Sequence, residues 1–128
     1  MIVVLDATAI IALLDRTTAV DDYVRAAHRV IAPDLAVAEV LNVRWKLWRA
    51  KLEAPALEDV FAVFDRISLV ASLTLAGQAV DLAERLDHPV YDCLYAAAAL
   101  HEGAQLVTAD RHLARKLKSS TSIDVRTF

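Results

Sequence analysis

Residues 2–14 read IVVLDATAIIALL, which is an apolar run, one acidic residue and then a second apolar run. Residues 2–5 predict a short strand buried on both faces, because all four side chains are apolar. Residues 8–14 predict a helix, and Asp6 lies at the junction between strand and helix. Ligands of parallel sheets bind beyond the carboxyl ends of the strands, so Asp6 either caps this helix or faces a binding site.

The alternation of strand and helix patterns continues along the chain. Asp34 is expected as the N-cap of a long helix, Pro55 in the first turn of the next one, and Gly103 as a C-cap. Continuous apolar strands that alternate with helices predict an α/β domain whose mainly parallel sheet is covered on both sides. The other expected strands are 30–32, 67–71, 104–108 and 122–126, and the other expected helices are 19–29, 34–52, 55–66, 74–87, 91–101 and 111–118.

Composition limits the classes of protein to which the chain could belong. With 128 residues, 57% of them apolar, it is expected to form a single domain, residues 1–128, with a substantial core. Charges interrupt every long apolar stretch, so no membrane span is expected. The start of the chain lacks the basic segment of a signal peptide, and the lone Cys93 fits a reducing compartment, so a cytoplasmic location is expected. Only two glycines are present, which excludes a P-loop and a dinucleotide fingerprint.

Four acidic residues stand where each could face one shared pocket. Asp6 follows the first strand, Asp110 follows the strand at 104–108, Asp92 begins the helix at 91–101, and Glu39 lies one turn inside the long helix. Gathered carboxylates repel one another unless a divalent cation lies between them, and oxygen-rich clusters suit Mg²⁺ or Mn²⁺. The four acids therefore predict metal-dependent phosphoryl chemistry, with helix capping as the alternative role for the three aspartates.

Hydroxyl and amide side chains accompany these acids. Thr8 and Thr108 each stand two residues from an aspartate, where they either orient a carboxylate or make local turn hydrogen bonds. Asn42 lies one turn after Glu39, and it either supports that carboxylate or makes a bond on the helix surface. The four histidines show no ligand spacing among themselves, so no metal role is expected for them; His112 is considered only as a phosphate contact.

The charge distribution and one long helix point to partners. The net charge is −3, but eight of the fourteen lysines and arginines fall in two short segments that either hold phosphates or form solvated helix faces. The helix at 34–52 is apolar nearly all round and includes Trp45 and Trp48, so it is either buried in the core or covered by a partner. The two basic segments are Arg44, Lys46, Arg49 and Lys51, and Arg111, Arg115, Lys116 and Lys118.

Taken together, these segments resemble the PIN-domain ribonucleases, in particular the VapC-type toxins of toxin–antitoxin pairs. The order of the acids, Asp–Glu–Asp–Asp, is the order in that family, and the resemblance covers nearly the whole chain. Thr8 stands where the family often has serine, which keeps the hydroxyl. Four local patterns carry the resemblance: DATAI at 6–10, AEVLNV at 38–43, YDCLYAAAAL at 91–100 and TADRHLA at 108–114.

The resemblance implies a three-layer α/β/α sandwich and Mg²⁺- or Mn²⁺-dependent cleavage of RNA. By position, Asp6, Asp92 and Asp110 would bind the metal, Glu39 more loosely, and the threonines and Asn42 would support them. The family also implies a cognate antitoxin that blocks the groove, a homodimer, and a heterotetramer or larger assembly with the antitoxin.

Other functions fit the sequence less well. A catalytically inactive PIN-like module that binds protein or RNA stays open, although the full set of four acids argues against it. A receiver domain would need an acidic pair after the first strand, where Asp6 stands alone. A haloacid-dehalogenase-like phosphatase would need an aspartate at the position of Thr8.

Overall fold

A computed structural model describes all 128 residues. Five strands form one sheet in the order β3-β2-β1-β4-β5, and all four pairs of neighbours are parallel. The strands are β1 (Ile2–Leu5), β2 (Arg29–Pro33), β3 (Ser68–Val70), β4 (Gln105–Thr108) and β5 (Val125–Thr127). The helices are α1 (Ala7–Leu14), α2 (Thr18–Ala26), α3 (Leu35–Arg49), α4 (Leu57–Asp65), α5 (Ser72–Leu86), α6 (Val90–Glu102) and α7 (Arg111–Ser120).

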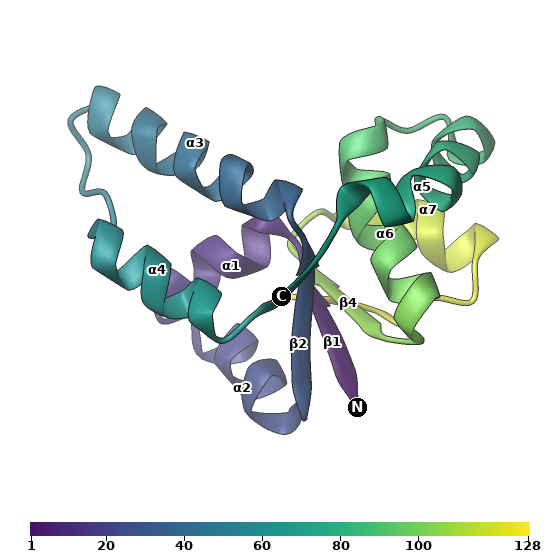
Figure 1. Cartoon of the computed structure of the whole chain (residues 1–128), viewed down its shortest axis with the longest axis horizontal. Coiled ribbons are helices and arrows are strands. Elements are labelled where there is room, and N and C mark those ends of the chain that lie inside the picture. Colours follow the sequence, from purple (N-terminus) through teal and green to yellow (C-terminus); the bar gives the residue numbers. More distant parts are fainter.

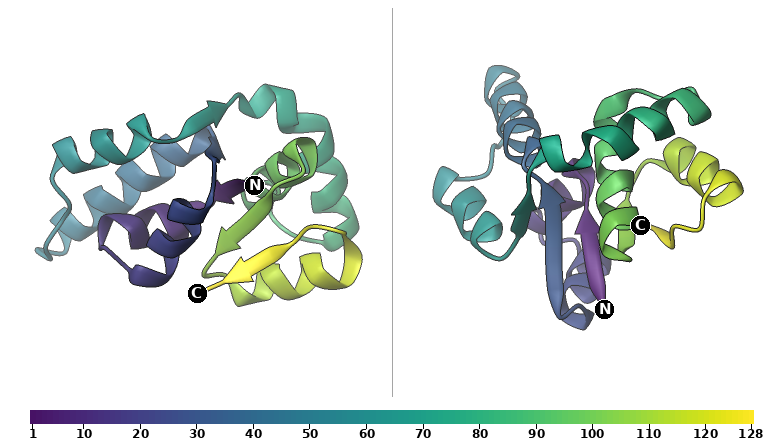
Figure 2. Two further views of the ribbon diagram at one scale, coloured as in Figure 1. Left: turned by 90° about the horizontal axis from the view of Figure 1, so that it is seen from below. Right: turned by 45° about the vertical axis from the view of Figure 1, so that its right-hand side comes forward.

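Helices cover both faces of the sheet, which confirms the α/β/α sandwich. Helices α1 to α4 lie on one face, and α5 to α7 lie on the other (Figures 1 and 2). The strand order explains this division. The chain moves outward from β1 to β3 and then returns to β4 and β5 on the other side of β1, and right-handed crossovers in opposite directions place their helices on opposite faces. The order therefore reverses between β1 and β4, where sheets of this kind bind their ligands.

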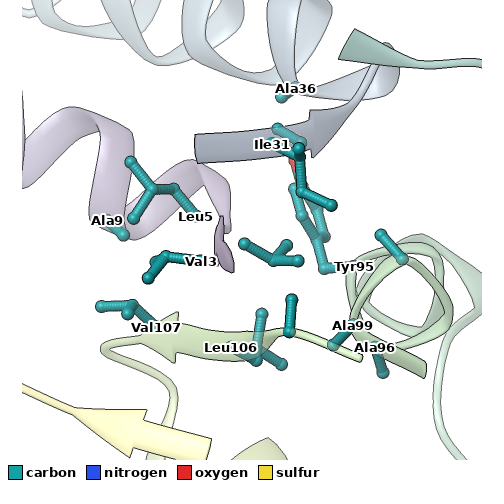
Figure 3. Packing of buried hydrophobic residues seen from close by; sticks show 14 of the residues in the cluster. Val3, Leu5, Ala9, Ile31, Ala36, Tyr95, Ala96, Ala99, Leu106 and Val107 are labelled. Carbon is teal, nitrogen blue, oxygen red and sulfur yellow. The ribbon is translucent and has the colours of Figure 1, made fainter. Parts of the chain in front are cut away.

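The core forms because the strands are apolar on both faces and α6 is rich in alanine. Val3, Val4 and Leu5 are fully buried in the centre of the sheet. Small side chains on α6 let that helix approach the sheet closely, and Figure 3 shows Ala96 and Ala99 beside Leu106 of β4. Among all the helices, none is long and apolar enough to cross a membrane.

Several local expectations were wrong. Asp34 is the N-cap residue of α3, as expected, but its side chain makes no capping bond; its carboxylate instead accepts hydrogen bonds from the backbone and hydroxyl of Ser72, at the start of α5. Pro55 lies outside α4, which begins two residues later at Leu57. The last strand begins at residue 125 rather than 122, where Val125 pairs with Leu106 of β4. Gly103 ends α6 with a positive φ of 62°, as expected.

Helix α3 is far less buried than its apolar sequence suggests. Only Ala36 and Val40 are buried, both in its first half. Trp45 is 46% exposed and Trp48 is 67% exposed, so the interpretation of these tryptophans as core residues was wrong. The outer half of α3 projects beyond the sheet together with α4 (Figure 1). Its apolar side chains are therefore free to contact another molecule.

Candidate metal centre

Asp6 is buried at the point where β1 ends, and both of its carboxylate oxygens are held. Its Oδ1 accepts the hydroxyl of Thr8 at 2.6 Å and the backbone N–H of Ala9 at 2.9 Å, and the latter bond caps α1. Its Oδ2 accepts the hydroxyl of Thr108. Leu5 pairs with Val107 in the sheet, so the next residue on each strand, Asp6 and Thr108, become neighbours. An ionised carboxylate offers about four acceptor positions. With three of them filled, one position on Oδ2 remains for a ligand.

The two threonines also bind the loop that follows β4. The hydroxyl of Thr8 accepts the N–H of Ala109 at 3.0 Å, and the hydroxyl of Thr108 accepts the N–H of Asp110 at 2.9 Å. Each hydroxyl therefore donates to Asp6 and accepts from the backbone beside Asp110. This double bridge fixes the carboxyl ends of β1 and β4 against each other. Asp110 itself caps α7 by accepting the N–H of Leu113 at 3.0 Å.

Asp92 lies in the first turn of α6 and does not cap that helix, for which Pro89 is the N-cap residue. Its Oδ2 lies 2.7 Å from Nε2 of His88, in the loop between α5 and α6. One possible ligand atom each from His88, Asp92 and Asp110 lies within 4.8 Å of the other two. Asp6 and Glu39 stand outside this group of three, although both are coupled to Asp92 by charge.

Glu39 reaches the same region from α3. Its Oε1 accepts the hydroxyl of Tyr95 at 3.0 Å, and Tyr95 is only 1% exposed. Tyr95 extends from α6 past Ile31 of β2 (Figure 3), so it bridges the helices that carry Asp92 and Glu39. The other oxygen of Glu39 makes no hydrogen bond within the chain.

Burial and mutual repulsion make the site unfavourable for negative charge. Burial raises the pKa of Asp6 above its ordinary value, its three hydrogen bonds oppose this rise, and the charge of Asp92 adds to it. Burial also raises the pKa of Glu39, the hydrogen bond from Tyr95 opposes this, and Asp92 and Asp6 add to it. Burial and the adjacent Glu39 carboxylate raise the pKa of Tyr95, so its hydroxyl stays a proton donor. No lysine or arginine forms an ion pair with any of the four acids.

Two residues of this site, His88 and Tyr95, were not expected from the sequence. The histidines show no ligand spacing among themselves, yet His88 lies four residues before Asp92, and that spacing is the signal for its place in the site. Tyr95 lies three residues after Asp92, on the same side of α6. Asn42 is exposed and makes no side-chain hydrogen bond, so its support of Glu39 stays a prediction. Glu39 itself turns toward Tyr95 of α6 rather than along the surface of α3.

The donor set fits a divalent cation. Several carboxylates with unfilled oxygen positions lie near one another without a lysine or arginine partner, which is the arrangement that Mg²⁺ and Mn²⁺ bind. The family implied by the sequence therefore agrees with the chemistry of the residues present.

Comparison with known proteins identifies the family. The PIN domain family model matches residues 3–118, so the chain belongs to the PIN domain family. A homologous protein, Ribonuclease VapC3 from Pyrobaculum aerophilum, is 33% identical over 124 residues, which cover 91% of this chain and 95% of the relative. The chain is thus a homologue of a VapC ribonuclease.

Solved structures agree on the fold. PAE2754 from Pyrobaculum aerophilum has a TM-score of 0.76 and 24% identity, over 96% of this chain and 81% of that one. A toxin–antitoxin complex from Klebsiella pneumoniae has a TM-score of 0.69 and 12% identity, over 98% of this chain and 96% of that one. VapBC2 from Rickettsia felis, bound to a DNA fragment from its promoter, has a TM-score of 0.65 and 15% identity, over 99% of this chain and 98% of that one. At these identities the likeness shows a shared fold.

Proposed function

We propose that this protein is a Mg²⁺- or Mn²⁺-dependent endoribonuclease that acts as the toxin of a type II toxin–antitoxin pair. The observation that carries the proposal is a group of acids near the strand-order reversal. Ligand atoms of Asp92 and Asp110 lie within 4.8 Å of one another, the charge of Asp92 acts on Asp6 and Glu39, and no lysine or arginine forms an ion pair with any of the four. Homology to a ribonuclease supports RNA as the substrate.

The residues of the site divide the work of hydrolysis. A bound Mg²⁺ or Mn²⁺ supplies charge stabilisation at the scissile phosphate and lowers the pKa of a water molecule. Asp6, Asp92 and Asp110 would hold the ion, and the hydrogen bonds from Thr8 and Thr108 keep the Asp6 carboxylate from rotating away. Glu39 has one oxygen fixed by Tyr95 and one free, so it accepts the proton of the attacking water. Attack by water that breaks the bond from phosphorus to the 3′-oxygen leaves a 5′-phosphate and, once that oxygen takes up a proton, a 3′-hydroxyl.

Basic residues of α7 hold the RNA backbone beside the scissile phosphate. Arg111, Arg115 and Lys118 are exposed and line one shallow hollow, and Arg111 directly follows Asp110. Arginine and lysine contacts to phosphates position a nucleic acid without reading its sequence. In the other basic segment, Arg44 donates to the carbonyl oxygen of Pro55 at 2.8 Å and Arg49 stacks on Trp45, so those two cations are already engaged.

The exposed apolar side chains of α3 and α4 form the antitoxin-binding surface. This α3–α4 surface consists of Leu41, Trp45, Trp48, Leu57 and Phe61, each at least 37% exposed. An apolar helix face of a partner would bury such side chains. A protein of the same fold occurs in a toxin–antitoxin complex, which supports an antitoxin as the kind of partner.

A second apolar surface, on β3 and α5, is the proposed contact of the homodimer. Leu69, Leu73 and Val80 are 45%, 87% and 48% exposed. Gly77 lies one turn from Leu73 and leaves open space above the helix, which permits a close approach by another helix. Replacing Leu73 with glutamate should shift the protein from dimer to monomer in light scattering.

The test of the proposed activity is cleavage of RNA by purified protein with EDTA, Mg²⁺ or Mn²⁺. We expect cleavage with either cation and none with EDTA, and sequencing of the fragments should find 5′-phosphate ends. Protein that binds RNA or antitoxin but leaves RNA uncut with both cations would instead be the inactive binding module. Ends bearing a 2′,3′-cyclic phosphate would rule out attack by water.

A further inference from the structure

His88 is a buried imidazole that the proposed nuclease mechanism leaves without a role. Its side chain is only 6% exposed, and Nε2 points to Asp92 at 2.7 Å. It lies in the loop between α5 and α6 rather than on a helix face, so its position depends on the loop. A polar ring that is buried at a cluster of carboxylates needs a reason to be there, because its desolvation costs free energy.

The loop that carries His88 is held from three directions. The N–H of His88 donates to the carbonyl oxygen of Ala83, in the last turn of α5, at 3.1 Å. Its own carbonyl oxygen accepts the thiol of Cys93 on α6 at 4.0 Å. The Nζ of Lys116 on α7 donates to the carbonyl oxygen of Asp87 at 2.8 Å. The imidazole is therefore placed before any ion binds, as a metal ligand should be.

We propose that His88 is a nitrogen ligand of the bound cation and forms with Asp92 and Asp110 a mixed nitrogen–oxygen centre. This inference rests on the proposed function only in requiring the cation site, not in requiring RNA cleavage. Its consequence is selectivity: imidazole nitrogen binds first-row transition ions, whereas Mg²⁺ takes oxygen ligands almost exclusively. The centre should therefore favour Mn²⁺ over Mg²⁺.

The distances agree with ligation. With bonds of about 2.1 Å, adjacent ligand atoms of one ion lie about 3 Å apart and opposite ones about 4.2 Å. The separation of 2.7 Å between His88 and Asp92 suits adjacent ligands. The three possible ligand atoms lie within 4.8 Å of one another, which is near the separation of opposite ligands of one ion.

A different role would give the same short distance. His88 could act only as a positioning residue whose N–H holds the Asp92 carboxylate. A glutamine at this position can still donate a hydrogen bond to Asp92 through its amide, but it has no imidazole nitrogen. His88→Gln therefore separates ligation from positioning. His112 is the matched control, because its exposed ring lies 5.9 Å from that of His88 and it supplies no atom to the group of three.

The decisive experiment is pulsed electron paramagnetic resonance on the full chain loaded with Mn²⁺, without RNA. We expect the ¹⁴N coupling of a directly bound nitrogen in the wild type and in His112→Gln, and its loss in His88→Gln. Wild-type protein labelled with ¹⁵N-histidine should also lose the ¹⁴N signal, which tests the ligand without any substitution. No ¹⁴N coupling in the wild type, or its persistence in either the variant or the labelled protein, would overturn the proposal.

Affinity provides a second measurement, by calorimetry with each ion. His88→Gln should weaken Mn²⁺ binding by roughly tenfold or more and Mg²⁺ binding by less than about threefold. Equal losses for both ions would mean that His88 only positions Asp92. Wild-type protein that binds neither ion would end both proposals, whereas a ¹⁴N signal from protein that leaves RNA uncut would end the proposed function alone.

Discussion

The carboxyl end of β1 and the outer half of α3 differ in how their side chains are placed: the first buries an acidic residue, and the second exposes large apolar residues. Asp6 is an acidic residue in the interior, and both of its carboxylate oxygens accept hydrogen bonds. Trp45 and Trp48 are large apolar residues at the surface, and nothing in the chain covers most of their area. The acids near the end of β1 lack a neutralising positive charge, whereas the tryptophans of α3 lack an apolar contact.

The residues proposed for catalysis and those proposed for binding the antitoxin therefore lie in different parts of the molecule. Interior groups bound in a fixed geometry suit a reaction, because they need no reorganisation when the substrate arrives. Exposed apolar side chains on a projecting helix suit a reversible partner, because the chain folds without them. Substitutions in the first region should therefore alter activity and stability, and those in the second should alter binding alone.

Asp92→Asn is expected to have the largest effect of the substitutions considered. The change removes one ligand charge from an exposed edge of the site while it keeps the shape, so cleavage should fall by roughly a hundredfold or more with the fold intact. RNA cleavage with Mn²⁺ and the circular dichroism spectrum measure the two effects. A variant that retains full activity would remove Asp92 from the mechanism. Asp6→Asn should abolish cleavage in the same way.

Thr108→Val tests how much the hydrogen bonds around Asp6 contribute. Valine keeps the shape but leaves a buried carboxylate oxygen and the N–H of Asp110 without this partner. The free energy of unfolding should fall by about 1–3 kcal/mol. Denaturant titration measures this loss, and a double variant with Asp6→Asn should show a coupling between the two sites. Additive losses would mean that the hydroxyl acts independently of Asp6.

Trp48→Glu tests the α3–α4 surface. Antitoxin affinity should fall roughly tenfold or more, whereas the free energy of unfolding should change by no more than about 0.5 kcal/mol. Trp48→Phe is the control, since it keeps an aromatic ring on the surface. Calorimetry with the antitoxin measures the affinity, and thermal melting measures the change in stability. A glutamate variant that keeps full antitoxin affinity would remove Trp48 from the binding surface.

The smallest expected effect is a pH dependence of the metal-free protein. Burial raises the pKa of Asp6 above its ordinary 3.8, so the folded protein holds this proton more tightly than the unfolded chain does. Stability is then lost as pH rises from 3.8 through the raised pKa. Melting from pH 4 to 7 should show a smaller loss for Asp6→Asn, and saturating Mn²⁺ should remove much of the loss in the wild type. Parallel curves without metal would contradict the raised pKa.

Local patterns predicted most of the architecture correctly. The strand IVVL and the helices rich in alanine and leucine are visible in the sequence, because apolar periodicity acts over a few residues. The errors fell where a distant contact competes with a local rule. Asp34 has the residue type and position of a helix cap, yet its carboxylate binds Ser72, which lies 38 residues away.

The candidate site divides in the same way. The aspartates that follow β1 and β4 were expected to meet, because the carboxyl ends of parallel strands share one edge of the sheet. His88 was not expected in the site, since the loop that carries it takes its position from contacts with three helices. Tyr95 was likewise missed, because its partner Glu39 lies 56 residues away in the chain.

The order of residues alone was enough to establish the α/β class, the PIN resemblance and the four acids, since each depends on residue type and short spacing. Folding in three dimensions settled which hydroxyl donates to which oxygen, which histidine approaches the acids and which tryptophans stay uncovered. Those outcomes depend on the strand register and on packing between segments far apart in the chain, and no short window of sequence contains that information.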